Sequence, residues 1–250
     1  RRLPVLTSGQ WKGQYRIYAI LYELLRVTGG KSEPEVLAGF LWAYQQVQPL
    51  TLGELWAVPM ILRFVIFHQL RELYAQINQW QLPANEKRSW HRKVAPLLAE
   101  STQQLNKAIL TLERSMDLSN PAVLLFLEQE FRRSADLKPL LFWLEARVKA
   151  ERFSLPDLKE KAQKRQAHER ATAGNLFRGL QEANLALWEE SFEELSLVEQ
   201  ILRQDPARVY PEMDYESRNQ VRREVELFAR EWRLPEEKVA RQVLALAQAA

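Results

Sequence analysis

The chain has 250 residues, of which 46% are hydrophobic and 27% charged, an ordinary globular composition that excludes the disordered and fibrous classes. It contains no cysteine, which excludes disulfides, thiolate metal sites and cysteine nucleophiles, and its three histidines lie far apart in sequence, so no metal site is predicted. The 35 Lys and Arg against 32 Asp and Glu give a net charge of +3. Because the densest cationic run, 159–170, is interrupted by two glutamates, we expect no nucleic-acid partner.

Apolar residues follow helical spacing through nearly the whole chain. The first stripe predicts a helix over 15–25, which Gly29 and Gly30 end by offering a left-handed cap. A second helix is predicted over 33–47, with Pro34 in its first turn, where the missing N–H is no loss.

The third predicted helix is long and begins with a capping box. Thr51 and Glu54 have the spacing at which each side chain accepts the other's backbone N–H, and the helix extends to about residue 77. Pro59 lies inside it, at a cost of about 3 kcal/mol that packing must offset. The most apolar run, 55–67, is too short to span a membrane, so we expect a buried core helix without a direct membrane span.

The rest of the chain repeats this pattern of caps and apolar stripes. Asn120 and Asp214 are predicted N-caps, and Gly174 is predicted to separate two helices. The expected helices cover 86–116 with an interruption near Pro96, then 121–133, 136–152, 155–172, 175–188, 189–203, 215–232 and 235–247.

These elements define the expected fold class. The chain has no hairpin signal and no sustained period-2 alternation, so we predict an all-α array of about ten helices in antiparallel hairpins, without a β-sheet. We expect one helical domain over 1–250, with a subdivision near 80–120 or 153 as the alternative. The absence of an initiator Met suggests a fragment of a larger multidomain enzyme.

Aromatic residues are concentrated in the first sixty positions. They are Trp11, Tyr15, Tyr18, Tyr22, Trp42, Tyr44 and Trp56. One interpretation is a platform on which sugar rings stack, with Arg16, Glu23 and Glu54 supplying hydrogen bonds. The other is that the rings fill the space between helices, and the i, i+3, i+7 spacing of the three tyrosines from residue 15 favours this second interpretation.

The residues show no catalytic constellation. Nucleophile-elbow, P-loop and dinucleotide-binding motifs are absent, and no pair of carboxylates stands out as a glycosidase pair. The helix-capping positions of Glu54 and Asp214, and the place of Asp205 at a helix stop, already explain these acids. We therefore predict no catalytic residue, metal or cofactor in this chain.

Several runs resemble one family. They are Leu3-Pro4-Val5-Leu6 with the following Tyr15-Arg16-Ile17-Tyr18-Ala19, then QQVQPLTLGELWAVPMILR at 45–63, Phe142-Trp143-Leu144-Glu145, and WEESFEELSLVEQILRQDPARVYPEMD at 188–214. In this order they resemble the helical region that precedes the glycosyltransferase domain of the cyclic β-1,2-glucan synthases. The stretch 79–139 matches that pattern poorly.

The resemblance implies a non-catalytic accessory or interaction domain of a membrane-bound enzyme that polymerises glucose from UDP-glucose and cyclises the product. It implies a location at the cytoplasmic face of the bacterial inner membrane, and the remaining domains of the synthase as partners, with β-1,2-glucan as a further candidate. A glucan-binding module with an aromatic groove is the alternative, and an independent helical carbohydrate-active enzyme is a third. The candidate residues for glucan binding or a domain interface are Trp11, Tyr15, Arg16, Tyr18, Trp56 and Tyr210.

The two longest matching runs also suggest a structural clasp. Arg63 lies among apolar neighbours and should be paired, and Glu54 and Asp205 are its candidate partners. With Asp214, these residues are predicted to hold the two runs together.

Overall fold

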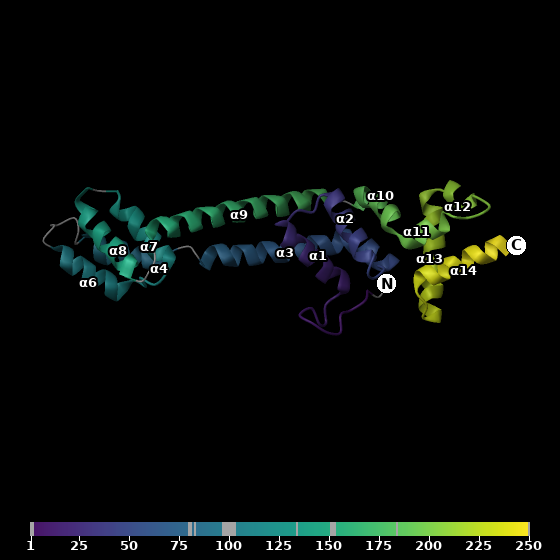
Figure 1. Ribbon diagram of the computed structural model, residues 1–250, viewed down its shortest axis with the longest axis horizontal. Coiled ribbons are helices and arrows are strands. Elements are labelled where there is room, and N and C mark those ends of the chain that lie inside the picture. Colours follow the sequence, from purple (N-terminus) through teal and green to yellow (C-terminus); the bar gives the residue numbers. More distant parts are fainter. Residues whose placement is uncertain are drawn as a thin grey trace. The chain divides into compact units, whose positions relative to one another are not determined.

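The computed structural model describes residues 3–79, 82, 84–96, 104–133, 135–150, 154–183 and 185–249. These residues form thirteen α-helices, one π-helical turn and one 3-10 turn, with no strand or sheet among them (Figure 1). A single antiparallel bridge pairs Val5 with Tyr15. The predicted all-α class is confirmed. In the same part of the chain, no helix has the length and hydropathy that crossing a membrane would require.

The chain divides into two compact units. Unit 1 comprises residues 1–71 and 172–250, and unit 2 comprises residues 72–171. Two long helices, α3 (Leu52–Gln79) and α9 (Leu155–Glu182), have residues in both units. The single domain predicted over 1–250 stays a prediction.

Unit 1 begins with two helices that end as the sequence predicts. Helix α1 (Arg16–Thr28) is followed by Gly29 at φ 64°, whose N–H donates to the Leu25 carbonyl. This is the left-handed cap for which glycine lacks the Cβ penalty. Helix α2 (Pro34–Gln45) has its proline in the first turn.

Helix α3 contains both the predicted capping box and the predicted interior proline. The Glu54 N–H donates to Thr51 Oγ1 at 3.2 Å, and the Thr51 N–H donates to Glu54 Oε2 at 2.9 Å. Pro59 has no N–H to give to the carbonyl of Leu55, four residues earlier. The indole Nε1 of Trp188 donates to that carbonyl at 2.8 Å, so a side chain from α10 (Leu185–Leu195) replaces the missing helix bond.

The predicted break at Gly174 is wrong, because α9 continues through this residue. A helical glycine costs only about 1 kcal/mol, and tertiary contacts offset such a cost. Asn175 Nδ2 donates to the carbonyl of Gly29 at 3.0 Å, and further along α9 a Cβ on Gly179 would lie 2.3 Å from Ser32 Oγ. This end of α9 is therefore fixed against the segment between α1 and α2.

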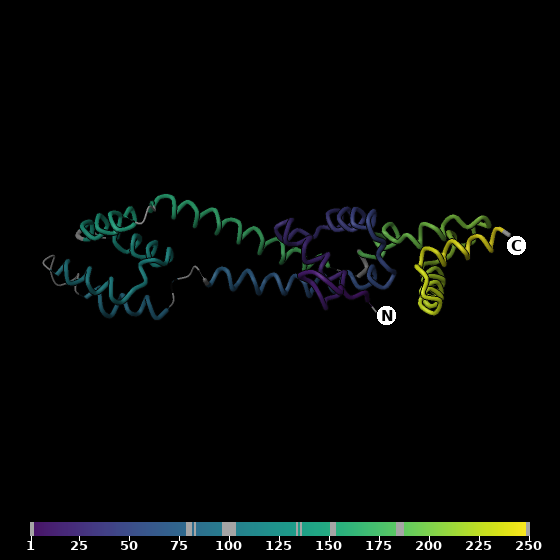
Figure 2. Tube along the Cα trace, turned by 60° about the horizontal axis from the view of Figure 1, so that its bottom comes forward, coloured from purple at the N-terminus to yellow at the C-terminus, as the bar shows by residue number. Residues whose placement is uncertain are grey.

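The remaining helices of unit 1 are short until the last two. They are α10 (Leu185–Leu195), α11 (Leu197–Leu202), α12 (Val209–Glu212), α13 (Tyr215–Trp232) and α14 (Glu236–Ala249). Helix α10 packs on α2, and α14 packs on both α11 and α13. Asp214 caps α13 as predicted, by accepting the Ser217 N–H at 2.8 Å. Arg233, at φ 55°, makes the sharp turn between α13 and α14, the yellow segments in Figure 2.

Unit 2 contains α4 (Ala84–Ser89), the π turn η1 (Trp90–Val94), α6 (Leu105–Ser115), α7 (Pro121–Phe131), the 3-10 turn η3 (Ala135–Leu137) and α8 (Lys138–Ala150). Asn120 caps α7 as predicted, through the Ala122 N–H. The expected interruption near Pro96 borders residues 97–103, which lie outside the described part of the chain. The buried cluster of this unit is apolar and includes Trp90, Leu112, Leu127, Phe131 and Leu144.

Candidate functional site

The predicted site residues do not form one site. All of them lie in unit 1. Six of them lie in four places, and Tyr15, Arg63, Asp205 and Asp214 lie outside these places. Two of these places are buried charge clusters and two are open pockets beside aromatic rings.

The first place is a buried ion pair between α1 and the start of α3. Arg16 Nε donates to Glu54 Oε1 at 2.8 Å, and Arg16 Nη2 donates to Glu54 Oε2 and to the carbonyl of Pro49. The exposed fraction is 8% for the Arg16 side chain and 0% for that of Glu54. The hydrogen bonds to Glu54 raise the pKa of Arg16, so this guanidinium stays charged. Because both side chains are covered and occupied, this pair is an anchor between helices rather than a surface for ligands.

The second place is an aromatic surface on α1 that we call the Trp11 surface. Trp11 lies 4.7 Å from the ring of Tyr22 and 6.0 Å from that of Tyr18, measured between centroids. The Tyr18 hydroxyl is hydrogen-bonded to His68 Nδ1 of α3, and this bond fixes the position of the Tyr18 ring. Trp11 and Tyr22 line an open pocket of about 770 Å³ together with Gln10, Glu23 and Arg26.

Tyr15, predicted for the same surface, lies elsewhere. It precedes α1, is about half exposed and pairs with Val5 through the backbone. The i, i+3, i+7 spacing places Tyr18 and Tyr22 together but not Tyr15, because the helix begins only at Arg16.

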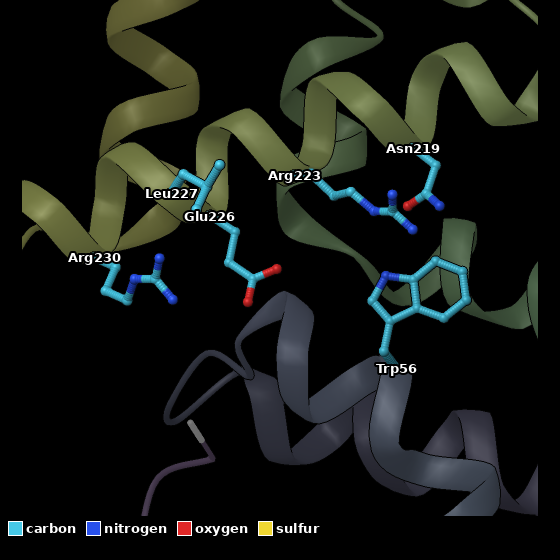
Figure 3. A pocket seen from close by; sticks show the side chains of 6 residues that line it. All are labelled: Trp56, Asn219, Arg223, Glu226, Leu227 and Arg230. Atoms are coloured by element: carbon cyan, nitrogen blue, oxygen red, sulfur yellow. The ribbon is translucent and has the colours of Figure 1, made fainter. Parts of the chain in front are cut away.

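The third place is a pocket of about 420 Å³ between Trp56 of α3 and one face of α13 (Figure 3). Its other lining residues are Asn219, Arg223, Glu226, Leu227 and Arg230. The Trp56 ring packs 4.5 Å from Phe192 and, edge-on, 6.4 Å from Tyr215, which holds the indole at the pocket. Asn219 Oδ1 is buried and has no hydrogen-bond partner among the described residues.

The fourth place is a network of two carboxylates and three guanidinium groups. Glu199, fully buried, accepts from Arg203 Nε at 2.8 Å and from Arg222 Nη1 at 2.7 Å. Glu193 accepts from Arg218 Nη2 at 2.9 Å and from Arg222 Nη1 at 3.3 Å. Together these bonds connect α10, α11 and α13.

Tyr210 belongs to this network and not to a sugar-binding surface. It is 5% exposed, and its hydroxyl donates to Glu199 Oε2 at 2.6 Å. Burial and the adjacent carboxylate raise the pKa of Tyr210, so it remains a donor. Burial alone would raise the pKa of Glu199, but the bonds from Tyr210, Arg203 and Arg222 together lower it.

The predicted clasp has different partners in the structure. Glu54 pairs with Arg16, whereas Arg63 is exposed and donates to the carbonyl of Ala183. Asp205 accepts the backbone N–H groups of its own loop, including that of Tyr210 at 3.0 Å, and these bonds lower its pKa. An exposed arginine needs no carboxylate partner, and this removes the reason for expecting the clasp.

Several residues of these four places were not predicted. Gln10, Arg26 and His68 complete the Trp11 surface, beside Tyr22 and Glu23, which the platform interpretation names. Glu193, Glu199, Arg203, Arg218 and Arg222 form the network. Arg218 and Arg222 lie four residues apart on α13, a spacing that puts both on one face, but only the fold shows which acids they meet. Within the described ranges, no three His, Asp or Glu side chains are placed to hold a metal ion.

Comparison with known proteins supports one relationship. No family model matches the chain. Over 236 residues, 92% of the chain, it is 26% identical to the protein named cyclic beta-(1,2)-glucan synthase NdvB of Rhizobium meliloti (strain 1021). The chain spans 8% of the length of that protein. The resemblance that the sequence runs indicate is thereby confirmed.

Proposed function

We propose that this chain, a relative of the cyclic β-1,2-glucan synthases, is a non-catalytic helical accessory module of such an enzyme. The synthase would polymerise glucose from UDP-glucose and cyclise the product at the cytoplasmic face of the inner membrane. The module's partners would be the remaining domains of the same enzyme.

One observation carries this proposal: the buried charged groups of the matching runs are used to hold helices together. Glu54 is occupied by Arg16 and by the N–H of Thr51, and Glu199 by two arginines and Tyr210. A catalytic carboxylate must reach the proton or the carbon on which it acts. Fully buried carboxylates whose oxygens are already taken by neighbouring donors cannot reach a substrate and instead fix the arrangement of the helices, which suits an accessory module.

The proposal is tested first on the chain alone. Purified chain is incubated with UDP-glucose, and separately with linear and cyclic β-1,2-glucan. We expect neither release of UDP nor new reducing ends. New reducing ends would instead support the independent-enzyme alternative and contradict the accessory role.

The partner is tested in a full-length synthase that carries this segment. Deleting the segment should abolish the production of cyclic glucan, and co-expressing the segment as a separate chain should restore it, because an accessory module acts through contact. A Glu199→Ala variant of the separate chain serves as a folding control and should fail to restore production. Unchanged production after the deletion would contradict the proposal.

A further inference from the structure

The loop before α1 is built to hold one indole ring on the surface of that helix. The Leu6 N–H donates to the Gln14 carbonyl at 2.9 Å, and the Gly13 N–H donates back to the Leu6 carbonyl at 2.8 Å. Gly9 and Gly13 have φ of 76° and 86°, a region that residues with a Cβ avoid. The loop between these bonds carries Trp11, so its position is set by backbone geometry and does not depend on burial of the ring.

The indole is neither buried in the core nor isolated in solvent. Trp11 and Tyr22 are both partly exposed and tilted by 59° to each other at 4.7 Å. Beneath them, Tyr18 contacts both rings and bonds to His68. A partly exposed aromatic ring that neighbouring rings hold in place offers an apolar face to a ligand, and the ring loses little conformational entropy on binding.

The polar side chains beside the rings are hydrogen-bonded to one another. Gln10 Nε2 donates to Glu23 Oε1 at 3.2 Å, and Arg26 Nε donates to Glu23 Oε2 at 2.6 Å. An amide, a carboxylate and a guanidinium present several donors and acceptors in planar groups, which suits pairs of adjacent hydroxyls. The carboxylate and the guanidinium cancel in charge, which favours an uncharged ligand over a phosphate or a nucleic acid.

We propose that the Trp11 surface binds a neutral oligosaccharide, with one sugar ring stacked on Trp11, its edge against the tilted ring of Tyr22, and its hydroxyls bonded to Gln10, Glu23 and Arg26. The pocket of about 770 Å³ is open, so it accommodates part of a longer glycan chain rather than an enclosed monosaccharide. Only the choice of β-1,2-glucan as the probe rests on the proposed function. The stacking and hydrogen-bonding geometry stands independently of it.

The experiment is calorimetric titration of the whole chain with linear β-1,2-glucan and, separately, with a cello-oligosaccharide of similar length. We expect saturable binding of the β-1,2-glucan by the unmodified chain. Trp11→Ala should weaken it by roughly tenfold or more, because it removes the stacking face. Glu23→Gln should weaken it by roughly tenfold, because it removes a charged acceptor that joins the other two polar groups.

Two further tryptophan variants make the test specific. Trp42→Ala, on the exposed part of α2, is the matched control and should bind like the unmodified chain. Trp56→Ala removes the ring of the pocket on α13 and should also leave the affinity unchanged. The helical circular dichroism of each variant is compared with that of the unmodified chain, and Glu23→Gln still tests the surface if the Trp11 variant fails to fold.

The outcomes separate this proposal from the proposed function. No binding of either glycan, or unchanged affinity in both Trp11→Ala and Glu23→Gln, overturns the site, as does loss of binding only in Trp56→Ala. Equal affinity for the two glycans, lost in Trp11→Ala, supports the site but counts against the proposed link to β-1,2-glucan synthesis.

Discussion

The two units of the molecule hold their interiors together by different means. Unit 1 buries Arg16 with Glu54, and Glu199 with Arg222, in addition to its apolar core. The core cluster of unit 2 is apolar, and its buried Glu128 pairs with an arginine whose side chain is 56% exposed. A buried ion pair requires one residue type at each end, whereas an apolar core accepts many combinations of equal volume.

The two longest runs that carry the family resemblance lie in the unit that buries ion pairs. The runs at 45–63 and 188–214 contain Glu54 and Glu199, the two carboxylates that are 0% exposed among the described residues, and both runs lie in unit 1. Unit 2 contains the stretch that is expected to match poorly, 79–139, and also the short matching run at 142–145. Where charge is buried, the physical requirement fixes the residue, and where the core is apolar it fixes only the volume.

The largest effect is expected from Glu199→Ala. It leaves Arg222, 1% exposed, without its nearest carboxylate, and breaking a buried pair in this way costs about 3–5 kcal/mol. Calorimetric unfolding should show a marked fall in the transition of unit 1. Glu194→Ala, an exposed acid on α10, is the matched control and should change stability by less than about 0.5 kcal/mol. Equal stability of the two variants would mean that the network is not what holds unit 1.

Glu54→Ala should cost somewhat less, about 3 kcal/mol. Arg16 would lose its carboxylate but keep its hydrogen bond to the Pro49 carbonyl, and α3 would lose half of its capping box. Denaturant unfolding followed by circular dichroism measures the change, with the exposed Glu35→Ala as the control. A cost below about 1 kcal/mol would contradict the buried anchor.

Glu236 differs from Glu54 and Glu199 because its hydrogen-bond donor is a backbone amide and not an arginine, and its pKa is raised. It accepts the Leu52 N–H at 2.7 Å, and burial raises its pKa from 4.5 to about 7. Because the folded-state pKa lies above the unfolded one, the folded chain retains this proton between pH 4.5 and 7, and stability falls as pH rises through that window.

Glu236→Gln should therefore raise the free energy of unfolding at pH 8, on the order of 2 kcal/mol, and leave it almost unchanged at pH 4.5. Thermal unfolding of both proteins at the two pH values measures this. A variant that is less stable than the unmodified chain at pH 8 would contradict this prediction, because it would show that the charged carboxylate stabilises the fold through its hydrogen bond from the Leu52 N–H.

The smallest effect is expected from a volume-conserving substitution in the apolar core of unit 2. Leu127, fully buried, should tolerate Leu127→Met at a cost below about 1.5 kcal/mol, because the volume is conserved. Leu127→Ala, which leaves a cavity, should cost about 2–5 kcal/mol and shows that the position is sensitive. If Leu127→Met cost as much stability as Leu127→Ala, the interior of unit 2 would tolerate substitution as poorly as the ion pairs of unit 1.

Most helix boundaries could be predicted because their signals are local. The Thr51–Glu54 capping box, the Asn120 and Asp214 caps and the left-handed Gly29 depend on residues within a few positions of each other. The failure at Gly174 has a non-local cause, since contacts with the α1–α2 segment carry the helix across it.

The sites were harder to predict because their partners are distant in sequence. Glu54 was recognised as a cap, but its partner Arg16 lies 38 residues earlier. Tyr210 was assigned to a surface, yet it is buried against Glu199. Tyr18 with Tyr22 could be inferred from helical spacing, and Glu23 was named as a hydrogen-bonding residue, whereas the contacts of Trp11, Gln10 and Arg26 with them depend on how the loop folds back on α1.

The division of the chain also sets an order of assembly during synthesis. Unit 2 is one uninterrupted segment, whereas unit 1 is completed only by residues 172–250. As the chain leaves the ribosome, Arg16 can find Glu54 early, but Glu199 and Arg222 emerge only after all of unit 2. Unit 1 therefore cannot close, and its first helices cannot bury all of their apolar faces, until residues 172–250 have been synthesised.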